Sequence, residues 1–118
     1  MAKILIIDDD PQIRRLLVEI LATAGHEIFE VEDGEEGLRL VQIHQPALVI
    51  TDILMPQTDG LEVIRELRRG APRIPTIAIS GGHAMFLRMA KRLGASATLV
   101  KPFRPMDLVS AVDELLAS

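Results

Sequence analysis

The stretch ILIIDDDPQIRRLLVEILATAG (residues 4–25) determines the class of fold. Its first four residues are apolar and mostly β-branched, which is typical of a strand covered on both faces. Three aspartates follow, and Asp10 and Pro11 are the expected N-cap and first residue of a helix that ends before Gly25. The apolar residues of this helix recur on one face: Ile13, Leu16, Leu17, Ile20, Leu21 and Ala24. The stretch therefore predicts a buried strand that leads directly into an amphipathic helix.

The alternation of strand and helix continues through the 118 residues. Four further runs have the length and composition of strands: EIFEV (27–31), ALVIT (47–51), TIAIS (76–80) and ATLV (97–100). A helical segment is expected after each run, starting at Asp33, at Asp59, before Met85 and at Pro105. The residues expected on the inward faces are Gly37, Leu38, Val41, Leu61, Ile64, Leu67, Met85, Phe86, Met89, Ala90, Leu93, Val109, Val112, Leu115 and Leu116.

Strands that alternate with helices require crossover connections, which make the sheet parallel and place helices on both of its faces. The expected fold is therefore α/β, with five helices and a flavodoxin-like, doubly wound sheet of five strands in the order 2-1-3-4-5. Residues 1–118 form a single expected domain.

Composition and charge exclude several functions. The chain has no cysteine, which rules out disulfides, thiolate metal sites and cysteine nucleophiles. The net charge of −4 and the low aromatic content argue against direct binding of nucleic acid. No apolar run approaches the roughly 18 residues that cross a bilayer, and the first residues are not typical of a signal peptide. We therefore expect a cytoplasmic protein without membrane contact.

The charge is unevenly distributed along the chain. Residues 1–59 carry 4 basic and 12 acidic side chains, a net charge of −8. Residues 60–118 carry 9 basic and 5 acidic side chains, a net charge of +4.

Polar residues follow the strands at one edge of the expected sheet, where open parallel sheets bind their ligands. Asp8 and Asp9 follow the first strand, Asp52 the third and Lys101 the fifth, and Ser80 ends the fourth. Three converging carboxylates repel one another unless a cation lies between them, and Mg²⁺ suits such oxygen ligands. A metal beside a carboxylate assists phosphoryl transfer, and a hydroxyl and an ammonium can bind phosphoryl oxygens. The pattern predicts phosphoryl chemistry at this edge.

Four motifs carry a resemblance to a known family: IDDD (7–10), ITDILMPQTDG (50–60), AIS (78–80) and VKPF (100–103). Together they resemble the receiver domain of two-component response regulators, over essentially the whole chain and with the expected spacing. The resemblance implies a signalling switch that catalyses its own phosphorylation and dephosphorylation and is not a metabolic enzyme. It also implies phosphorylation by a histidine kinase or a histidine phosphotransfer domain, and a downstream partner that the sequence does not name.

The resemblance implies a role for each site residue. Asp52 is the phosphoryl acceptor, and Ser80 and Lys101 contact the phosphoryl group. Mg²⁺ is held by Asp8, Asp9, Asp52 and the backbone carbonyl of Leu54. By the same resemblance, the Lys101–Pro102 peptide bond is expected to be cis. The chain is expected to end with its fifth helix, without an output domain.

One position departs from the family pattern. Receivers usually carry Tyr or Phe three residues before the lysine, where this chain has Thr98. We therefore expect the signal to pass from Ser80 through the loop and helix start that follow the fourth strand, over residues 81–88.

Two other functions are compatible with parts of the sequence. A phosphatase of the haloacid dehalogenase type would use the D-x-D pattern of Asp8 and Asp10, with Asp8 as nucleophile, but would leave Asp52 without a role. A receiver-like domain that has lost phosphorylation and only recruits partners is compatible with Thr98. The complete set of Asp9, Asp52, Ser80 and Lys101 argues against this alternative, because a domain that only recruits partners does not require these groups.

Overall fold

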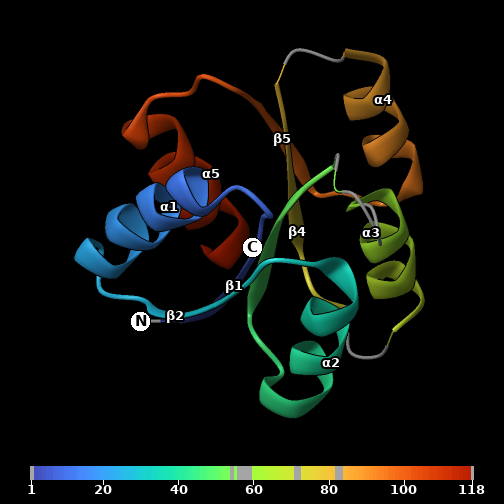
Figure 1. Cartoon of the computed structure of the whole chain (residues 1–118), viewed down its shortest axis with the longest axis horizontal. Coiled ribbons are helices and arrows are strands. Elements are labelled where there is room, and N and C mark those ends of the chain that lie inside the picture. Colours follow the sequence, from blue (N-terminus) through green and yellow to red (C-terminus); the bar gives the residue numbers. More distant parts are fainter. Residues whose placement is uncertain (1, 54, 56–59, 71–72, 82–83, 118) are drawn as a thin grey trace.

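The computed structural model describes residues 2–53, 55, 60–70, 73–81 and 84–117. Within them, five strands alternate with five helices (Figure 1). The strands are β1 (Lys3–Ile7), β2 (Glu27–Val31), β3 (Leu48–Asp52), β4 (Thr76–Ser80) and β5 (Ala97–Val100). The helices are α1 (Pro11–Thr23), α2 (Gly34–His44), α3 (Gly60–Arg69), α4 (Ala84–Leu93) and α5 (Pro105–Ala117). No helix in these residues is long and apolar enough to cross a membrane.

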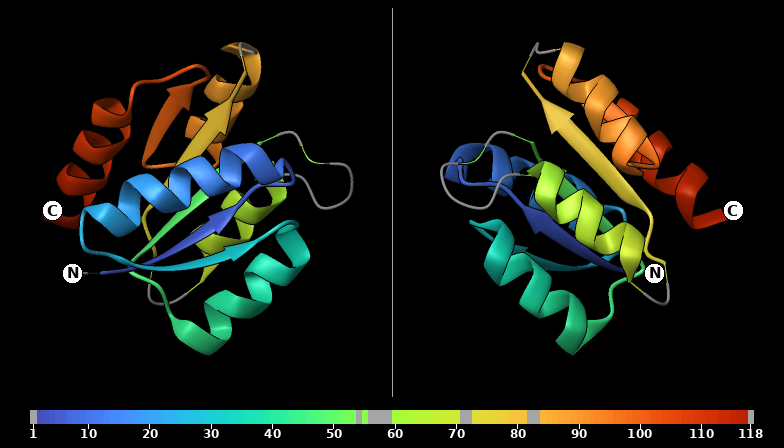
Figure 2. Two further views of the ribbon diagram at one scale, coloured as in Figure 1. Left: turned by 60° about the vertical axis from the view of Figure 1, so that its left-hand side comes forward. Right: turned by 90° about the vertical axis from the view of Figure 1, so that its right-hand side faces the viewer.

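The strands form one parallel sheet in the order β2-β1-β3-β4-β5, which confirms the predicted flavodoxin-like arrangement. Helices α1 and α5 cover one face, and α2, α3 and α4 cover the other (Figure 1 and Figure 2). Successive side chains of a strand point to opposite faces, so Ile4 and Ile6 pack under α1 and α5 while Leu5 and Ile7 pack under α2 and α3. The continuous apolar runs are therefore buried because both faces are covered.

The third strand begins and ends one residue later than the sequence predicts. Ala47 is exposed, and Asp52 is still paired with Ile79 of β4. The amide of Ile53 continues the ladder by donating to the carbonyl oxygen of Ile79 at 3.0 Å. Asp52 is thus a strand residue, and its position is fixed by the sheet.

Two predicted core assignments are wrong in helix α4. Met85 and Met89 are 63% and 41% exposed. The inward stripe consists of Phe86, Ala90 and Leu93, at the i, i+4, i+7 spacing of one helix face, so the two methionines lie on the flank. Leu16 of α1 is likewise exposed beside the inward stripe of its helix. In α5 the fully buried Leu108 was not among the core residues predicted from the sequence.

The expected helix ends agree with the structure where it describes them. The Asp10 side chain accepts hydrogen bonds from the amides of Gln12 and Ile13, and Asp33 accepts one from Glu36. Pro11 and Pro105 are the first residues of α1 and α5. Gly25 has a φ of +94°, a conformation that favours glycine. The predicted cap Asp59 lies outside the described residues.

Candidate functional site

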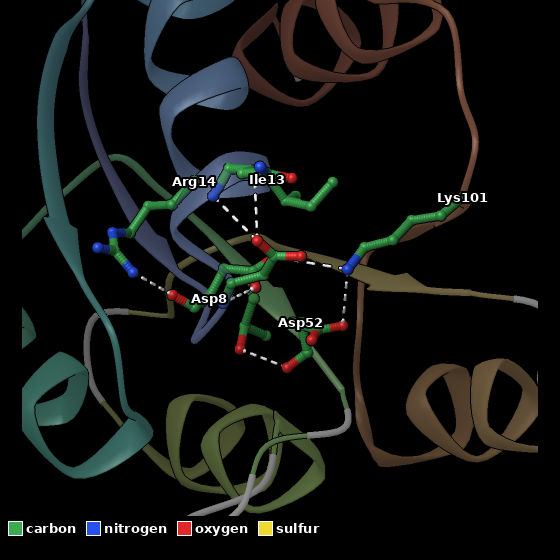
Figure 3. A network of polar contacts seen from close by, with 8 residues as sticks. Asp8, Ile13, Arg14, Asp52 and Lys101 are labelled. Atoms are coloured by element: carbon green, nitrogen blue, oxygen red, sulfur yellow. Dashed lines mark hydrogen bonds and ion pairs between the residues drawn. The ribbon is translucent and has the colours of Figure 1, made fainter.

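The carboxyl ends of β1, β3 and β4 and the residue after β5 meet at one edge of the sheet (Figure 3). Asp8 follows β1, Asp52 and Ser80 are the last residues of β3 and β4, and Lys101 follows β5. Asp8, Asp52 and Ser80 are almost fully buried. The Lys101 amide donates to the Ser80 carbonyl at 2.8 Å, which holds the two residues side by side.

Three carboxylates converge in this site. Asp8, Asp9 and Asp52 each offer one oxygen, and these oxygens lie within 4.8 Å of one another. Asp8 and Asp52 are buried and Asp9 is exposed. Hard carboxylate oxygens at this spacing, one of them open to solvent, match the ligands that a divalent cation prefers. The sequence-predicted metal ligands that the structure describes are therefore brought together, whereas Leu54 lies outside the described residues.

The Lys101 ammonium lies over the carboxylates. Its Nζ is 3.5 Å from Oδ1 of Asp52 and 3.6 Å from Oδ2 of Asp8 (Figure 3). The Lys101–Pro102 peptide bond is cis, as the resemblance predicted. A single cation thus faces two buried anions, and the acidic cluster is only partly neutralised by the described residues.

Two buried polar atoms have no hydrogen-bond partner among the described residues. They are Oδ2 of Asp8 and Oγ of Ser80. Leaving such an atom unsatisfied costs roughly 1–3 kcal/mol, so native proteins rarely retain one without a reason. Oδ2 of Asp8 can accept a cation, and the Ser80 hydroxyl can donate to an anionic oxygen. Both atoms fit a site that binds an ion and an anionic group.

Burial and neighbouring negative charges raise the pKa values of two carboxyl groups in this cluster, those of Asp52 and Asp8. The pKa of the Asp52 carboxyl is raised to about 6, first by burial and then by the negative charge of Asp8, while the Lys101 ammonium acts in the opposite direction. Burial also raises the pKa of Asp8, against a hydrogen bond from the Asp10 amide that lowers it. A bound divalent cation would favour the ionised form of both acids.

Asp8 and Asp10 both lie in the β1–α1 loop, but their side chains have different roles. The Asp10 amide donates to Oδ1 of Asp8 at 2.9 Å, while Oδ1 of Asp10 accepts from the Gln12 amide at 2.9 Å. Asp10 is therefore occupied as a helix cap and does not belong to the three converging carboxylates. The D-x-D pair of a dehalogenase-type site is not formed by these side chains.

Two supporting residues were missed by the sequence analysis. Nη1 of Arg14 donates to the carbonyl oxygen of Asp8 at 2.7 Å (Figure 3). Its Nε forms an ion pair with Glu30 of β2 at 3.0 Å. The Thr51 hydroxyl donates to the carbonyl oxygen of Asp52 at 2.9 Å. Arg14 carries a weak signal in the sequence, because a side chain one turn into a helix reaches back toward the loop before it.

Gly60 allows close packing beside Asp52. A Cβ at this position would overlap the backbone carbonyl oxygen of Asp52 and lie 2.7 Å from the Cα of Ile53. The Gly60 amide donates to the Ile53 carbonyl at 2.8 Å. The start of α3 therefore lies directly against the end of β3.

A family model of the response regulator receiver domain matches residues 4–113. The chain is 39% identical over 114 residues to the transcriptional regulatory protein PdtaR of Mycobacterium tuberculosis, covering 94% of this chain and 55% of that protein. It is 31% identical over 115 residues to the alkaline phosphatase synthesis transcriptional regulatory protein PhoP of Bacillus subtilis, covering 97% of this chain and 48% of that protein. The chain thus spans about half the length of these curated relatives.

Solved structures agree with the sequence relatives. The receiver domain of NtrX from Brucella abortus superposes with a TM-score of 0.93 at 32% identity, over 98% of both chains. The chemotaxis protein CheY4 of Vibrio cholerae superposes with a TM-score of 0.90 at 30% identity, again over 98% of both chains.

Proposed function

This chain belongs to the family of response regulator receiver domains, and from this premise we propose that it accepts a phosphoryl group on Asp52 and changes conformation in response. Receiver domains are switches in two-component signalling and not metabolic enzymes. The observation that carries the proposal is the surrounding of Asp52: a buried carboxylate at a strand end, beside two further carboxylates and 3.5 Å from an ammonium.

The nucleophile is a carboxylate oxygen of Asp52. It attacks the phosphorus of a phosphohistidine on the partner, so that an O–P bond forms and the N–P bond breaks. The histidine nitrogen leaves with the bonding electron pair, and an acyl phosphate remains on Asp52. Ionised Asp52 is the reactive form, and a divalent cation held beside it would favour that form.

Lys101 and Ser80 bind the transferred group. The Lys101 ammonium exchanges its contact with the Asp52 carboxylate for one with the phosphoryl oxygens, whose charge of about −1.5 to −2 is larger. The Ser80 hydroxyl, which has no partner among the described residues, donates to the same oxygens. Both groups approach from β4 and β5, so binding draws the ends of these strands toward Asp52.

Asp8, Asp9 and Asp52 are the proposed ligands of Mg²⁺, together with the backbone carbonyl of Leu54. When bound, Mg²⁺ neutralises charge on the phosphoryl oxygens during transfer. Asp8 would contribute its Oδ2, which accepts no hydrogen bond from the described residues. The Asp10 amide donates to its Oδ1, and Arg14 donates to its backbone carbonyl oxygen. The same arrangement supports hydrolysis of the acyl phosphate, so the domain catalyses both its phosphorylation and its resetting.

The phosphodonor is a histidine kinase or a histidine phosphotransfer domain, and a downstream protein reads the phosphorylated state. We assign this exchange to the cytoplasm, because the phosphoryl group of such a donor comes from a nucleoside triphosphate. The added charge biases an equilibrium between two conformations of the region after β4.

The direct test is phosphorylation by a small phosphodonor. The protein is incubated with acetyl phosphate and Mg²⁺, its intact mass is measured, and borohydride reduction marks the acylated aspartate for peptide mapping. We expect one phosphate on Asp52, and none in Asp52→Asn. Asp10→Asn is the matched control, because it removes a nearby carboxylate but retains a good helix cap.

The same experiment separates the alternatives. A phosphate on Asp8 would favour dehalogenase-type chemistry. Absence of any label in the wild-type protein would favour a domain that only recruits partners.

A further inference from the structure

A hollow of about 440 Å³ lies between α3 and α4, at the end of the sheet opposite to Asp52. Its lining includes Thr76, the first residue of β4, and Ser96, which precedes β5. Figure 1 shows α3 and α4 side by side over the β4 side of the sheet. This α3–α4 hollow is therefore separate from the acidic cluster, which lies where the same strands end.

The charged side chains that line the α3–α4 hollow are all basic: Arg68, Arg73, Lys91 and Arg92. Within the part of the chain that the structure describes, none of the four forms an ion pair with an acidic side chain. Helix α3 does carry acids, but Glu62 and Glu66 pair with Arg65 and Arg69 at 2.7 and 3.8 Å. Four positive charges thus line one small space without a balancing anion.

Two of these cations donate hydrogen bonds to backbone carbonyl oxygens, and one of the two bonds crosses from α3 to α4. Nη1 of Arg68 in α3 donates to the carbonyl oxygen of Arg92 in α4 at 3.0 Å. Nζ of Lys91 donates to the carbonyl oxygen of Ser96 at 3.2 Å. Each contact uses one of several N–H groups, so the remaining donors of both side chains can bind a ligand.

Gly94 leaves room for the Arg68 side chain to reach the carbonyl oxygen of Arg92. Its φ is +125°, which disfavours other residues, and a Cβ there would lie 2.7 Å from Cδ of Arg68. The Arg68 stem therefore packs over the backbone of Gly94. The four cationic side chains of the lining are exposed to solvent, and Arg68 is the one whose stem packs against Gly94.

We propose that the α3–α4 hollow binds a small anion with several linked phosphate groups. Guanidinium groups bind phosphate oxygens in pairs, and an ammonium adds a point charge, so the lining matches a short polyphosphate chain. A volume of about 440 Å³ is within the range of small-molecule sites. Ile64, Ile74 and Pro75 add an apolar part to the lining, which can contact a nucleoside attached to the phosphates.

A nucleic acid fits this site less well. Strand-binding proteins combine a long cationic track with aromatic side chains that stack on bases. Here the four cations surround one hollow, and none of the three phenylalanines of the chain lines it. We therefore assign the site to a free small molecule.

The test is calorimetric titration of the whole chain with inorganic tripolyphosphate and, separately, with ATP, in EDTA without Mg²⁺. We expect saturable binding with one ligand per chain. Arg73→Gln should weaken binding about 5-fold or more, and the double variant Arg68→Gln/Lys91→Gln about 20-fold or more. Because Arg68 also supports packing, Arg73→Gln, whose side chain has no such contact among the described residues, keeps the test valid if the double variant unfolds.

Arg65→Gln is the matched control. It removes the same charge from α3 but lies outside the hollow, so binding should change less than 2-fold. Equal affinity for both ligands would show that the phosphate chain is sufficient, and tighter binding of ATP would show that the nucleoside contributes.

Three results would overturn the proposal: no saturable binding at millimolar ligand, an equal loss in Arg65→Gln, or tighter binding of a single-stranded oligonucleotide than of either small ligand. Asp52→Asn should bind tripolyphosphate and ATP with the affinity of the wild-type protein. Failure of anion binding at the α3–α4 hollow can therefore be distinguished from failure of phosphorylation at Asp52.

Discussion

Nζ of Lys101 lies 3.5 Å from Oδ1 of Asp52, although the two residues are 49 positions apart in the chain. The contact places the cation that follows β5 against the carboxylate at the end of β3, across the intervening strand β4. Because Lys101 also lies 3.6 Å from Asp8, one ammonium balances two buried carboxylates. The cluster therefore carries excess negative charge.

In the absence of divalent cations, Asp52 should make the stability of the protein fall as the pH rises. The pKa of its carboxyl is about 6 in the folded protein, against 3.8 as the ordinary value. Between these pH values the folded state binds more protons than the unfolded state. The free energy of unfolding therefore decreases as the pH rises from about 4 to 6. Urea unfolding in EDTA should show Asp52→Asn to be more stable than wild type at pH 7, by up to about 3 kcal/mol. Equal stabilities at pH 7 would contradict the prediction.

Millimolar Mg²⁺ should raise the melting temperature of the wild-type protein, because it binds the folded state alone. A tenfold excess over the dissociation constant corresponds to about 1.4 kcal/mol, or roughly 3–6 °C for a domain of this size. Asp9→Ala should abolish the increase with little effect on the metal-free protein, since Asp9 is exposed. Asp10→Asn should retain it. An unchanged response in Asp9→Ala would place the cation elsewhere.

Arg14→Met should loosen the loop that carries the acidic pair. It removes the hydrogen bond to the Asp8 carbonyl and the ion pair with Glu30, and we expect a loss of about 1–2 kcal/mol in stability and weaker binding of Mg²⁺. Glu30→Gln is the control, because its amide oxygen still accepts from Arg14. Denaturant unfolding and Mg²⁺ titration measure the two effects. Equal behaviour of the two variants would mean that the Asp8 carbonyl contact is dispensable.

Gly60→Ala should destabilise the protein by about 1–3 kcal/mol, because the added methyl group overlaps the backbone at Asp52 and Ile53. It should also slow phosphorylation by acetyl phosphate. Gly70→Ala, at the other end of α3, meets nothing closer than 3.5 Å and should be close to neutral. A neutral Gly60→Ala in thermal unfolding would show that α3 can move away from β3 without cost.

A phosphoryl mimic such as beryllofluoride with Mg²⁺ should shift amide resonances most strongly over residues 81–88. Ser80 is expected to move toward the mimic and displace the residues after it. Thr98, a half-buried residue of β5 that pairs with Ala78 of β4, has no ring to reorient. Backbone chemical-shift mapping measures this. Large shifts over residues 97–100 without shifts at 81–88 would show that the signal passes through β5.

The sheet was predictable because parallel strands covered on both faces consist of continuous apolar runs, and because strand ends in this fold meet at one edge. Asp8, Asp9, Asp52, Ser80 and Lys101 could therefore be selected from the sequence. The end of β3 was placed one residue early, because hydrogen bonding to β4 extends a strand past its last apolar residue. No local pattern marks that end.

Other features depend on three-dimensional packing. Met85 and Met89 have helical spacing relative to Phe86, but only the position of α4 over the sheet decides which flank is buried. The contact of Arg14 with a backbone carbonyl and the gathering of Arg68 and Lys91 in one hollow depend on side chains that cross between elements. Sequence periodicity carries no information about such contacts.

The placement of acidic and basic groups at opposite ends of one sheet gives the molecule a permanent electric polarity along its strands. The acidic cluster forms the negative pole and the α3–α4 hollow the positive pole. This field would turn an approaching protein with a positive surface toward the acidic cluster, and such an association would be faster at low ionic strength. Each phosphoryl group added at the negative pole increases this polarity. Phosphorylation at Asp52, as we propose it, would therefore leave a domain with a stronger long-range field than the one that the phosphodonor approached.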